Sequence, residues 1–239
     1  MDFLRNFWKK PTPLVELGLT IPLFVFYHLA IPLSSYKNVF DPLSKLFYDL
    51  ANYSIGLYLL YVAALGGFIF GLFLFLDKNR SFSLGKFFLL ALESTLYAII
   101  AALFSQLAVH KLLAIGAGKL DSFIGSFGAG FYEELVFRVL FYGLGLQIIL
   151  WLSSANSTKK PTSKIKTILL SIAWAILVSF IFSLVHYVLG ARDTFQLSSF
   201  LFRMFMGICL TLIYVSRGFA VAVWTHTIFD IMVTVNFLR

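Results

Sequence analysis

The chain has 239 residues, of which 60% are hydrophobic and 13% are charged, whereas soluble domains carry about a quarter charged residues. This composition excludes a soluble globular domain and indicates an integral membrane protein. The formal net charge of +8 does not indicate a nucleic-acid partner, because the basic residues gather at the ends of apolar segments, where membrane topology explains them. The apolar segments are continuous rather than alternating, which argues against a membrane β-barrel.

About seven apolar spans are predicted, each reaching or approaching the roughly 20 residues that a transmembrane helix needs. In chain order they are 14–33, 54–76, 87–109, 124–152, 168–190, 200–215 and 219–237. The mixed segment 34–53 is predicted to form an interfacial helix, and the fourth span is long enough to tilt or break. We therefore expect an all-α polytopic bundle, with residues 1–239 in a single membrane domain.

The distribution of basic residues predicts the orientation of this bundle. The first apolar stretch follows a basic segment and lacks a small-x-small cleavage site, so it is interpreted as an uncleaved span. More lysines and arginines lie in the loops on the N-terminal side than in those on the other side. The positive-inside rule then predicts a cytoplasmic N-terminus and an external C-terminus, in the cell (inner) membrane.

Two adjacent glutamates and an arginine lie in the middle of the fourth span, in the string Glu133-Glu134-Leu135-Val136-Phe137-Arg138. Charges at bilayer depth cost on the order of a few kcal/mol each and usually mark a functional site. Glu134 and Arg138 are four residues apart, so they share a helical face and are predicted to pair. Glu133 lies about 100° away around the helix, and burial disfavours its charged form unless another helix supplies a partner. Such a carboxyl suits a general base; the alternative is a charge cluster that only holds helices together.

Two strings in later spans carry histidines. Phe182-Ser183-Leu184-Val185-His186 lies near the end of the fifth span, and His226-Thr227-Ile228-Phe229-Asp230 lies in the seventh. Asp230 shares a face with His226 and is expected to orient it or accept its proton. The alternatives are an interhelical donor role for His186 and a local His–Asp hydrogen bond without a substrate. Helical rise places both histidines, Asp230 and Glu133 in the same outer half of the membrane, which predicts one cavity that opens outward.

The other embedded polar residues are interpreted as structural. Glu93 and Arg203 are expected to pair across helices, and His110 is expected to be interfacial. The single cysteine, Cys209, excludes an internal disulfide and is interpreted as a packing residue. Glu16 and His28 are also embedded polar residues and are likewise interpreted as structural. Small residues before the glutamates are expected to let helices approach closely; they are Gly125, Gly128, Ala129 and Gly130.

Together, the three polar strings resemble the CPBP family, which groups type II CAAX prenyl endopeptidases with bacteriocin-processing and self-immunity proteins. The family pattern is Glu-Glu-x-x-x-Arg, Phe-x-x-x-His and His-x-x-x-Asn/Asp on successive core helices, and the resemblance covers residues 87–237. It implies an intramembrane glutamic endopeptidase acting on a membrane-associated protein or peptide. By this resemblance, Glu133 activates water with the help of His186, His226 and Asp230 stabilise the oxyanion, and Glu134 and Arg138 support them.

The family position at Asp230 is often Asn. An Asn side chain donates to an oxyanion, whereas an ionised Asp repels it, so Asp230 is either protonated or only orients His226. No cofactor is expected. Zinc held by two histidines and a carboxylate is the alternative mechanism, although no His-Glu-x-x-His string is present.

A transporter or a non-catalytic scaffold of the same fold is the alternative function, because embedded charges also mark ion paths. No internal repeat of the kind found in transporters is evident. For a peptidase, an outward-opening site suits a secreted peptide or a C-terminal sorting tail better than a prenylated CAAX protein.

Overall fold

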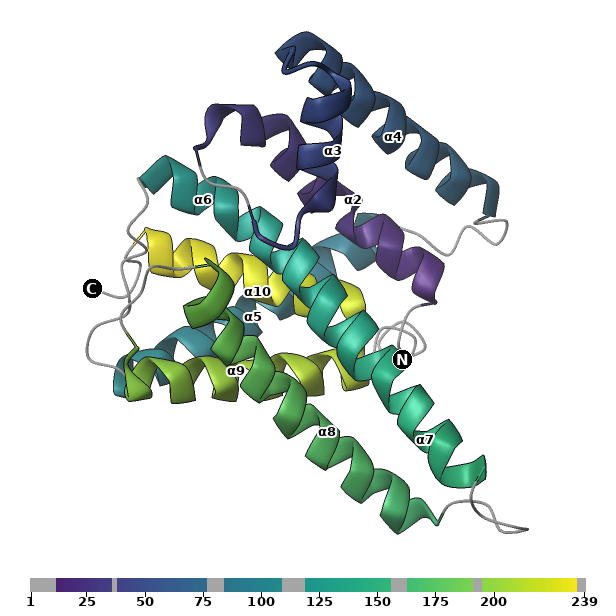
Figure 1. The fold of residues 1–239 in the computed structure, drawn as a ribbon, viewed down its shortest axis with the longest axis vertical. Helices are drawn as coiled ribbons and strands as arrows, with labels where there is room; N and C mark the ends of the chain where they lie inside the picture. The colour runs from purple at the N-terminus through teal and green to yellow at the C-terminus, as the bar shows by residue number, and fades with distance from the viewer. Residues whose placement is uncertain are drawn as a thin grey trace.

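The computed structural model describes residues 12–35, 38–76, 84–108, 119–155, 163–190 and 195–235, and these residues fold almost entirely into helices (Figure 1). The elements, in chain order, are α2 Pro13–Ala30, η1 Ile31–Leu33, α3 Pro42–Leu50, α4 Ile55–Leu76, α5 Leu84–Ala108, α6 Lys119–Gly128, η2 Ala129–Glu133, η3 Leu135–Leu144, α7 Gly145–Ala155, α8 Lys164–Val185, η4 His186–Gly190, α9 Leu197–Arg217 and α10 Phe219–Thr234.

The predicted all-α polytopic bundle is confirmed. Among the described residues, six helical segments are long and apolar enough to cross a membrane, and α10 is a shorter apolar helix. The six segments correspond to the first six predicted spans, and α10 corresponds to the seventh. The protein is therefore an integral membrane protein.

Helix α10 is the central helix of the bundle. It packs against α2, α5, α6, α9 and η2, and most of its residues are buried, including Ala220, Ala222 and Val223. Helix α4 is the opposite case, because only 11% of the residues in its apolar stretch are buried within the protein. A helix enclosed by protein does not have to match the thickness of the bilayer, which is consistent with the short length of α10.

The fourth span does not break. Segments α6, η2, η3 and α7 form one continuous rod, which runs diagonally across the molecule (Figure 1). Segments η2 and η3 are π-helical. This helix type, with hydrogen bonds between residues five apart, is rare and is often found at functional sites. Helix α6 begins five residues earlier than the predicted span, which places Glu133 about 7 Å further along the rod.

The first turn of α10 is anchored to α2. The carboxylate of Glu16 accepts a hydrogen bond from the backbone N–H of Phe219 at 3.0 Å, and a negative charge is favourable at a helix N-terminus. Gly218, which precedes the helix, has φ +103°, and a Cβ there would collide with this carboxylate. The turn therefore requires glycine, and Glu16 has a structural role.

The predicted pairing of Glu93 with Arg203 is wrong. Glu93 in α5 instead forms a two-pronged ion pair with Arg217 at the end of α9, with Nε–Oε1 and Nη2–Oε2 distances of 2.6 and 2.8 Å. The planar guanidinium favours this geometry, and the pair ties α5 to the end of α9.

The polar segment between the first two spans contains a helix, as predicted. Asp41 caps α3 by accepting hydrogen bonds from the N–H groups of Leu43 and Ser44, both at 3.0 Å. His28 is fully buried beside this helix, and its ring nitrogens contact the hydroxyls of Tyr58 and Tyr132 at 3.1 and 2.6 Å. His110 lies outside the described residues.

Candidate active site

The rod that carries the glutamates approaches α10 unusually closely at Gly130. A Cβ at this position would collide with the side chain of Thr227 and would lie 3.0 Å from the backbone oxygen of Val223. Only glycine permits this approach, which brings the glutamates next to the helix that carries His226.

Glu134 lies between a cation and a histidine. Its Oε2 is 3.0 Å from Nε of Arg138, as the helical spacing predicted, and its Oε1 is 2.8 Å from Nδ1 of His226. Glu134 and Arg138 are 0% and 1% exposed, so water cannot screen this pair. The guanidinium also lies 4.7 Å from the ring centre of Phe182 and donates to the carbonyl of Gly207 at 3.4 Å.

Glu133 takes its partners from other parts of the chain. Its Oε1 accepts a hydrogen bond of 2.9 Å from Nδ2 of Asn38, and its Oε2 lies 3.7 Å from Nε2 of His186. The sequence predicted that Glu133 lacks a counter-ion in its own helix, and both of these side-chain partners indeed lie outside the rod. Asn38 was missed, because it lies in a loop 95 residues away with no helical spacing to reveal it.

The tautomer of His186 follows from its neighbours. Nδ1 lies 2.8 Å from the carbonyl oxygen of Phe182, one turn earlier. A carbonyl only accepts, so Nδ1 carries a proton, and in the neutral ring Nε2 is an acceptor. This acceptor faces Oε2 of Glu133, and the side chain of His186 remains 27% exposed.

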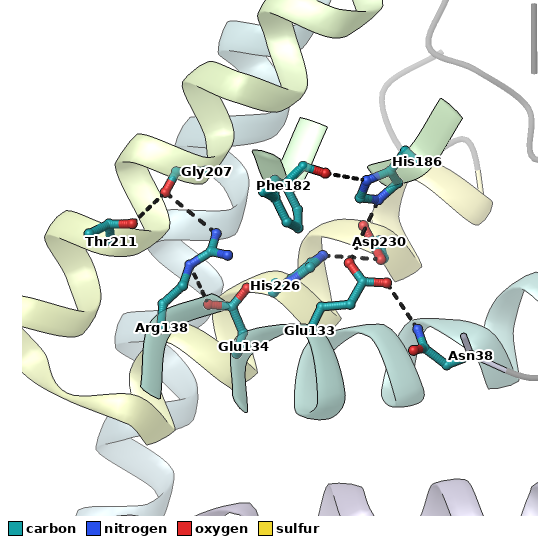
Figure 2. A network of polar contacts seen from close by, with 10 residues as sticks. All are labelled: Asn38, Glu133, Glu134, Arg138, Phe182, His186, Gly207, Thr211, His226 and Asp230. Carbon is teal, nitrogen blue, oxygen red and sulfur yellow. Dashed lines mark hydrogen bonds and ion pairs between the residues drawn. The ribbon is translucent and has the colours of Figure 1, made fainter. Parts of the chain in front are cut away.

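His226 is held on the other side of the site. Because the ionised carboxylate of Glu134 only accepts, Nδ1 of His226 donates to it, while Nε2 lies 3.6 Å from Oδ2 of Asp230. The short contact that orients His226 is thus made by Glu134, and Asp230 is the more distant partner. Figure 2 shows the side chains of Glu133, His186, His226 and Asp230 pointing toward one another from three separate helical segments.

Among the residues that the structure describes, no group of three or more His, Cys, Asp or Glu side chains is arranged to hold a metal ion. Nδ1 of His186 is hydrogen-bonded to the carbonyl of Phe182, and Nδ1 of His226 is hydrogen-bonded to Glu134. The two Nε2 atoms face different carboxylates: that of His186 faces Glu133, and that of His226 faces Asp230.

The fold is that of a polytopic membrane protein, and its bundle encloses a buried cluster of carboxylate, histidine and arginine side chains. Residues 115–232 match the family model described as type II CAAX prenyl endopeptidase Rce1-like. This segment is an Rce1-like domain, and the resemblance to the CPBP family is confirmed. No curated protein and no solved structure gives a match.

The matched segment contains the six candidate site residues of the three strings and all of α10 except its last two residues. This family is one of CAAX-type proteases, which implies that this membrane-embedded chain is a protease.

Proposed function

We propose that the protein is an intramembrane endopeptidase that hydrolyses a peptide bond with water activated by Glu133. The observation that carries the proposal is the pair of acceptors formed by Oε2 of Glu133 and Nε2 of His186, 3.7 Å apart. Two facing acceptors do not hydrogen-bond to each other, but a water molecule that reaches them can donate to both. Glu133 then takes the proton as the water oxygen attacks the peptide carbonyl, which is general base catalysis.

His226 is proposed to stabilise the oxyanion that forms on the attacked carbonyl. In its imidazolium form both ring nitrogens donate, Nδ1 to Glu134 and Nε2 toward Asp230 and the site. A preorganised donor of this kind acts most strongly in an enclosed site from which water is excluded. Asp230 orients the imidazolium and does not itself contact the oxyanion, because an ionised carboxylate would repel it.

Glu134 and Arg138 support this arrangement. Arg138 balances the charge of Glu134, and Glu134 in turn fixes the ring of His226. Because a buried carboxylate is costly without a partner, the ion pair lets Glu134 remain charged next to the histidine.

The substrate class is proposed from the topology. Loop charges predict that the site opens on the outer face, which favours a secreted peptide or a C-terminal sorting tail over a prenylated CAAX protein. Two quenched fluorescent peptides in proteoliposomes separate these options, one a farnesylated CAAX peptide and the other an unprenylated peptide with a hydrophobic C-terminal tail. Comparing the membrane proteome of cells that express wild type or Glu133→Ala identifies the natural substrate.

The mechanism is tested by Glu133→Gln, which keeps the shape of the side chain but removes its basicity. We expect cleavage to fall by at least about 10³-fold, within the range for the loss of a general base. The matched control is Glu93→Gln, another embedded glutamate whose partner is Arg217. Retained proteolysis in folded Glu133→Gln would refute the mechanism.

Zinc chemistry is tested on the same wild-type preparation. The glutamate mechanism predicts that EDTA and phenanthroline leave cleavage unchanged. Loss of activity with chelator, restored by added zinc, would instead favour the metal-dependent alternative.

A further inference from the structure

The loop between η1 and α3 brings a polar side chain to the site from outside the three strings. Asn38 in this loop is 4% exposed, and its amide nitrogen donates to Oε1 of Glu133 at 2.9 Å. Asn38 lies outside the residues that match the Rce1-like family model. The loop therefore adds a polar contact to the site from outside the matched domain.

The orientation of the Asn38 side chain is set by its own neighbours. Its Oδ1 accepts a hydrogen bond from the backbone N–H of Phe40 at 2.8 Å. Because that N–H can only donate, the amide nitrogen must be the end that faces Glu133. The backbone N–H of Asn38 is fixed as well, since it donates to the hydroxyl of Tyr27 at 3.2 Å.

The loop is fastened on both sides of Asn38. Upstream, the hydroxyls of Ser34 and Ser35 donate to the two carboxylate oxygens of Asp121 in α6, at 2.7 and 2.6 Å. Downstream, Asp41 caps α3. Asn38 is thus held between the rod that carries Glu133 and a helix whose start is capped, so that its amide is preorganised.

We propose that Asn38 is a positioning residue for the reaction, which holds Oε1 of Glu133 so that Oε2 faces His186 and the attacking water. A carboxylate with both oxygens unrestrained rotates about its terminal torsion, which is broad and roughly two-fold. One fixed donor on Oε1 selects one rotamer. A donated hydrogen bond also favours the ionised carboxylate, which is the form that acts as a base.

Asp230, in the same site, cannot donate a hydrogen bond when it is ionised. Asn38 supplies a neutral amide donor to the site. It acts on the base and not on the oxyanion.

The test rests on the proposed function and compares three variants of the full-length protein in proteoliposomes. Asn38→Ala removes the donor, and Asn38→Asp keeps the shape but replaces the amide by a carboxyl. Ser44→Ala is the control, because Ser44 is equally buried beside the loop but contacts His28 and Tyr58 instead of Glu133. The probe is whichever of the two quenched fluorescent peptides wild type cleaves faster, and rates are normalised to folded protein.

We expect kcat to fall about tenfold in Asn38→Ala, with KM within about twofold of wild type, because the contact is made to the base and not to the substrate. The acid limb of the kcat/KM–pH profile should move to higher pH in Asn38→Ala and further in Asn38→Asp, where a second carboxyl faces Glu133. The groups that face Glu133 from the packed elements, His186, His226, Asp230 and Arg138, are unchanged in all three variants.

An unshifted acid limb in both Asn38 variants would overturn the proposal, as would an equal shift in Ser44→Ala, because either result would make Asn38 merely structural. These outcomes differ from failure of the proposed function, which would appear as retained cleavage in Glu133→Gln.

Discussion

At the scale of single residues, the site is organised around His226, which lies between two acids at unequal distances. Glu134 is 2.8 Å from Nδ1, and Asp230 is 3.6 Å from Nε2. The shorter contact fixes the ring, and the longer one leaves Nε2–H without a close acceptor, so that a substrate oxygen can accept its hydrogen bond. The two acids therefore make different contacts with His226, and variants of the two are expected to behave differently.

Asp230→Asn is expected to keep cleavage within about tenfold of wild type. The Asn oxygen still accepts from Nε2 of His226, and its amide can donate to the oxyanion. Asp230→Leu, which has similar bulk and no polar group, is expected to lose at least about 100-fold. The measurement is kcat on the cleaved peptide; an inactive Asp230→Asn would show that the negative charge itself is required.

Arg138→Met is expected to lower the free energy of unfolding by about 3–5 kcal/mol, because it leaves the carboxylate of Glu134 buried without its cation. The double variant Glu134→Gln/Arg138→Met should recover much of this stability without recovering activity, since Gln does not replace the charge next to His226. Unfolding in detergent micelles measures the first effect, and peptide cleavage measures the second. If the single and double variants are equally unstable, the ion pair is not the cause.

At the scale of elements, the close approach of η2 to α10 determines whether the site forms. The sequence predicted close packing from the small residues before the glutamates, and the structure locates it at Gly130. The sequence strings also predicted the ion pair of Glu134 with Arg138, because both residues lie in one helix. Asn38 and the pairing of Glu93 with Arg217 could not be predicted in this way, because tertiary packing alone brings these segments together.

Gly130→Ala is expected to reduce cleavage by at least about tenfold and to cost about 1–3 kcal/mol of stability, because the added methyl group forces α10 away from the rod. Gly71→Ala in the lipid-facing helix α4 is the matched control: a Cβ there meets nothing within 4 Å, and its effect should stay within about 0.5 kcal/mol. Adding Thr227→Ala to Gly130→Ala should restore part of the loss by removing the hydroxyl that the methyl group meets. Equal losses in Gly130→Ala and Gly71→Ala would argue against a special contact.

At the scale of the whole molecule, the site lies toward one end of the bundle and structural ties lie toward the other. His186 follows the end of α8, and Ser34 and Ser35 contact the beginning of α6. The Glu16–Phe219 contact and the Glu93–Arg217 pair lie near the start of α2 and the end of α9. The helix order could be read from hydropathy, but the direction of the bundle in the membrane depends on loop charges.

Reporter fusions test that direction. If the site faces outward, alkaline phosphatase fused after residue 239 should be active and a fluorescent protein fused there should be dark, because seven spans place the two ends on opposite sides. An independent control is Ser35→Cys in a Cys209→Ser background, which should react with an impermeant thiol reagent added to whole cells. A fluorescent C-terminal fusion would place the site on the cytoplasmic face and would favour a prenylated substrate.

The enclosure of α10 has a consequence for biogenesis. Two of the four converging side chains, His226 and Asp230, are on α10, and this helix is anchored to Glu16, 203 residues earlier in the chain. The ribosome therefore completes Glu133 and His186 well before their counterparts exist. Under the proposed mechanism, the nascent chain is therefore expected to be unable to cleave peptides until α10 is inserted among the helices already in the membrane.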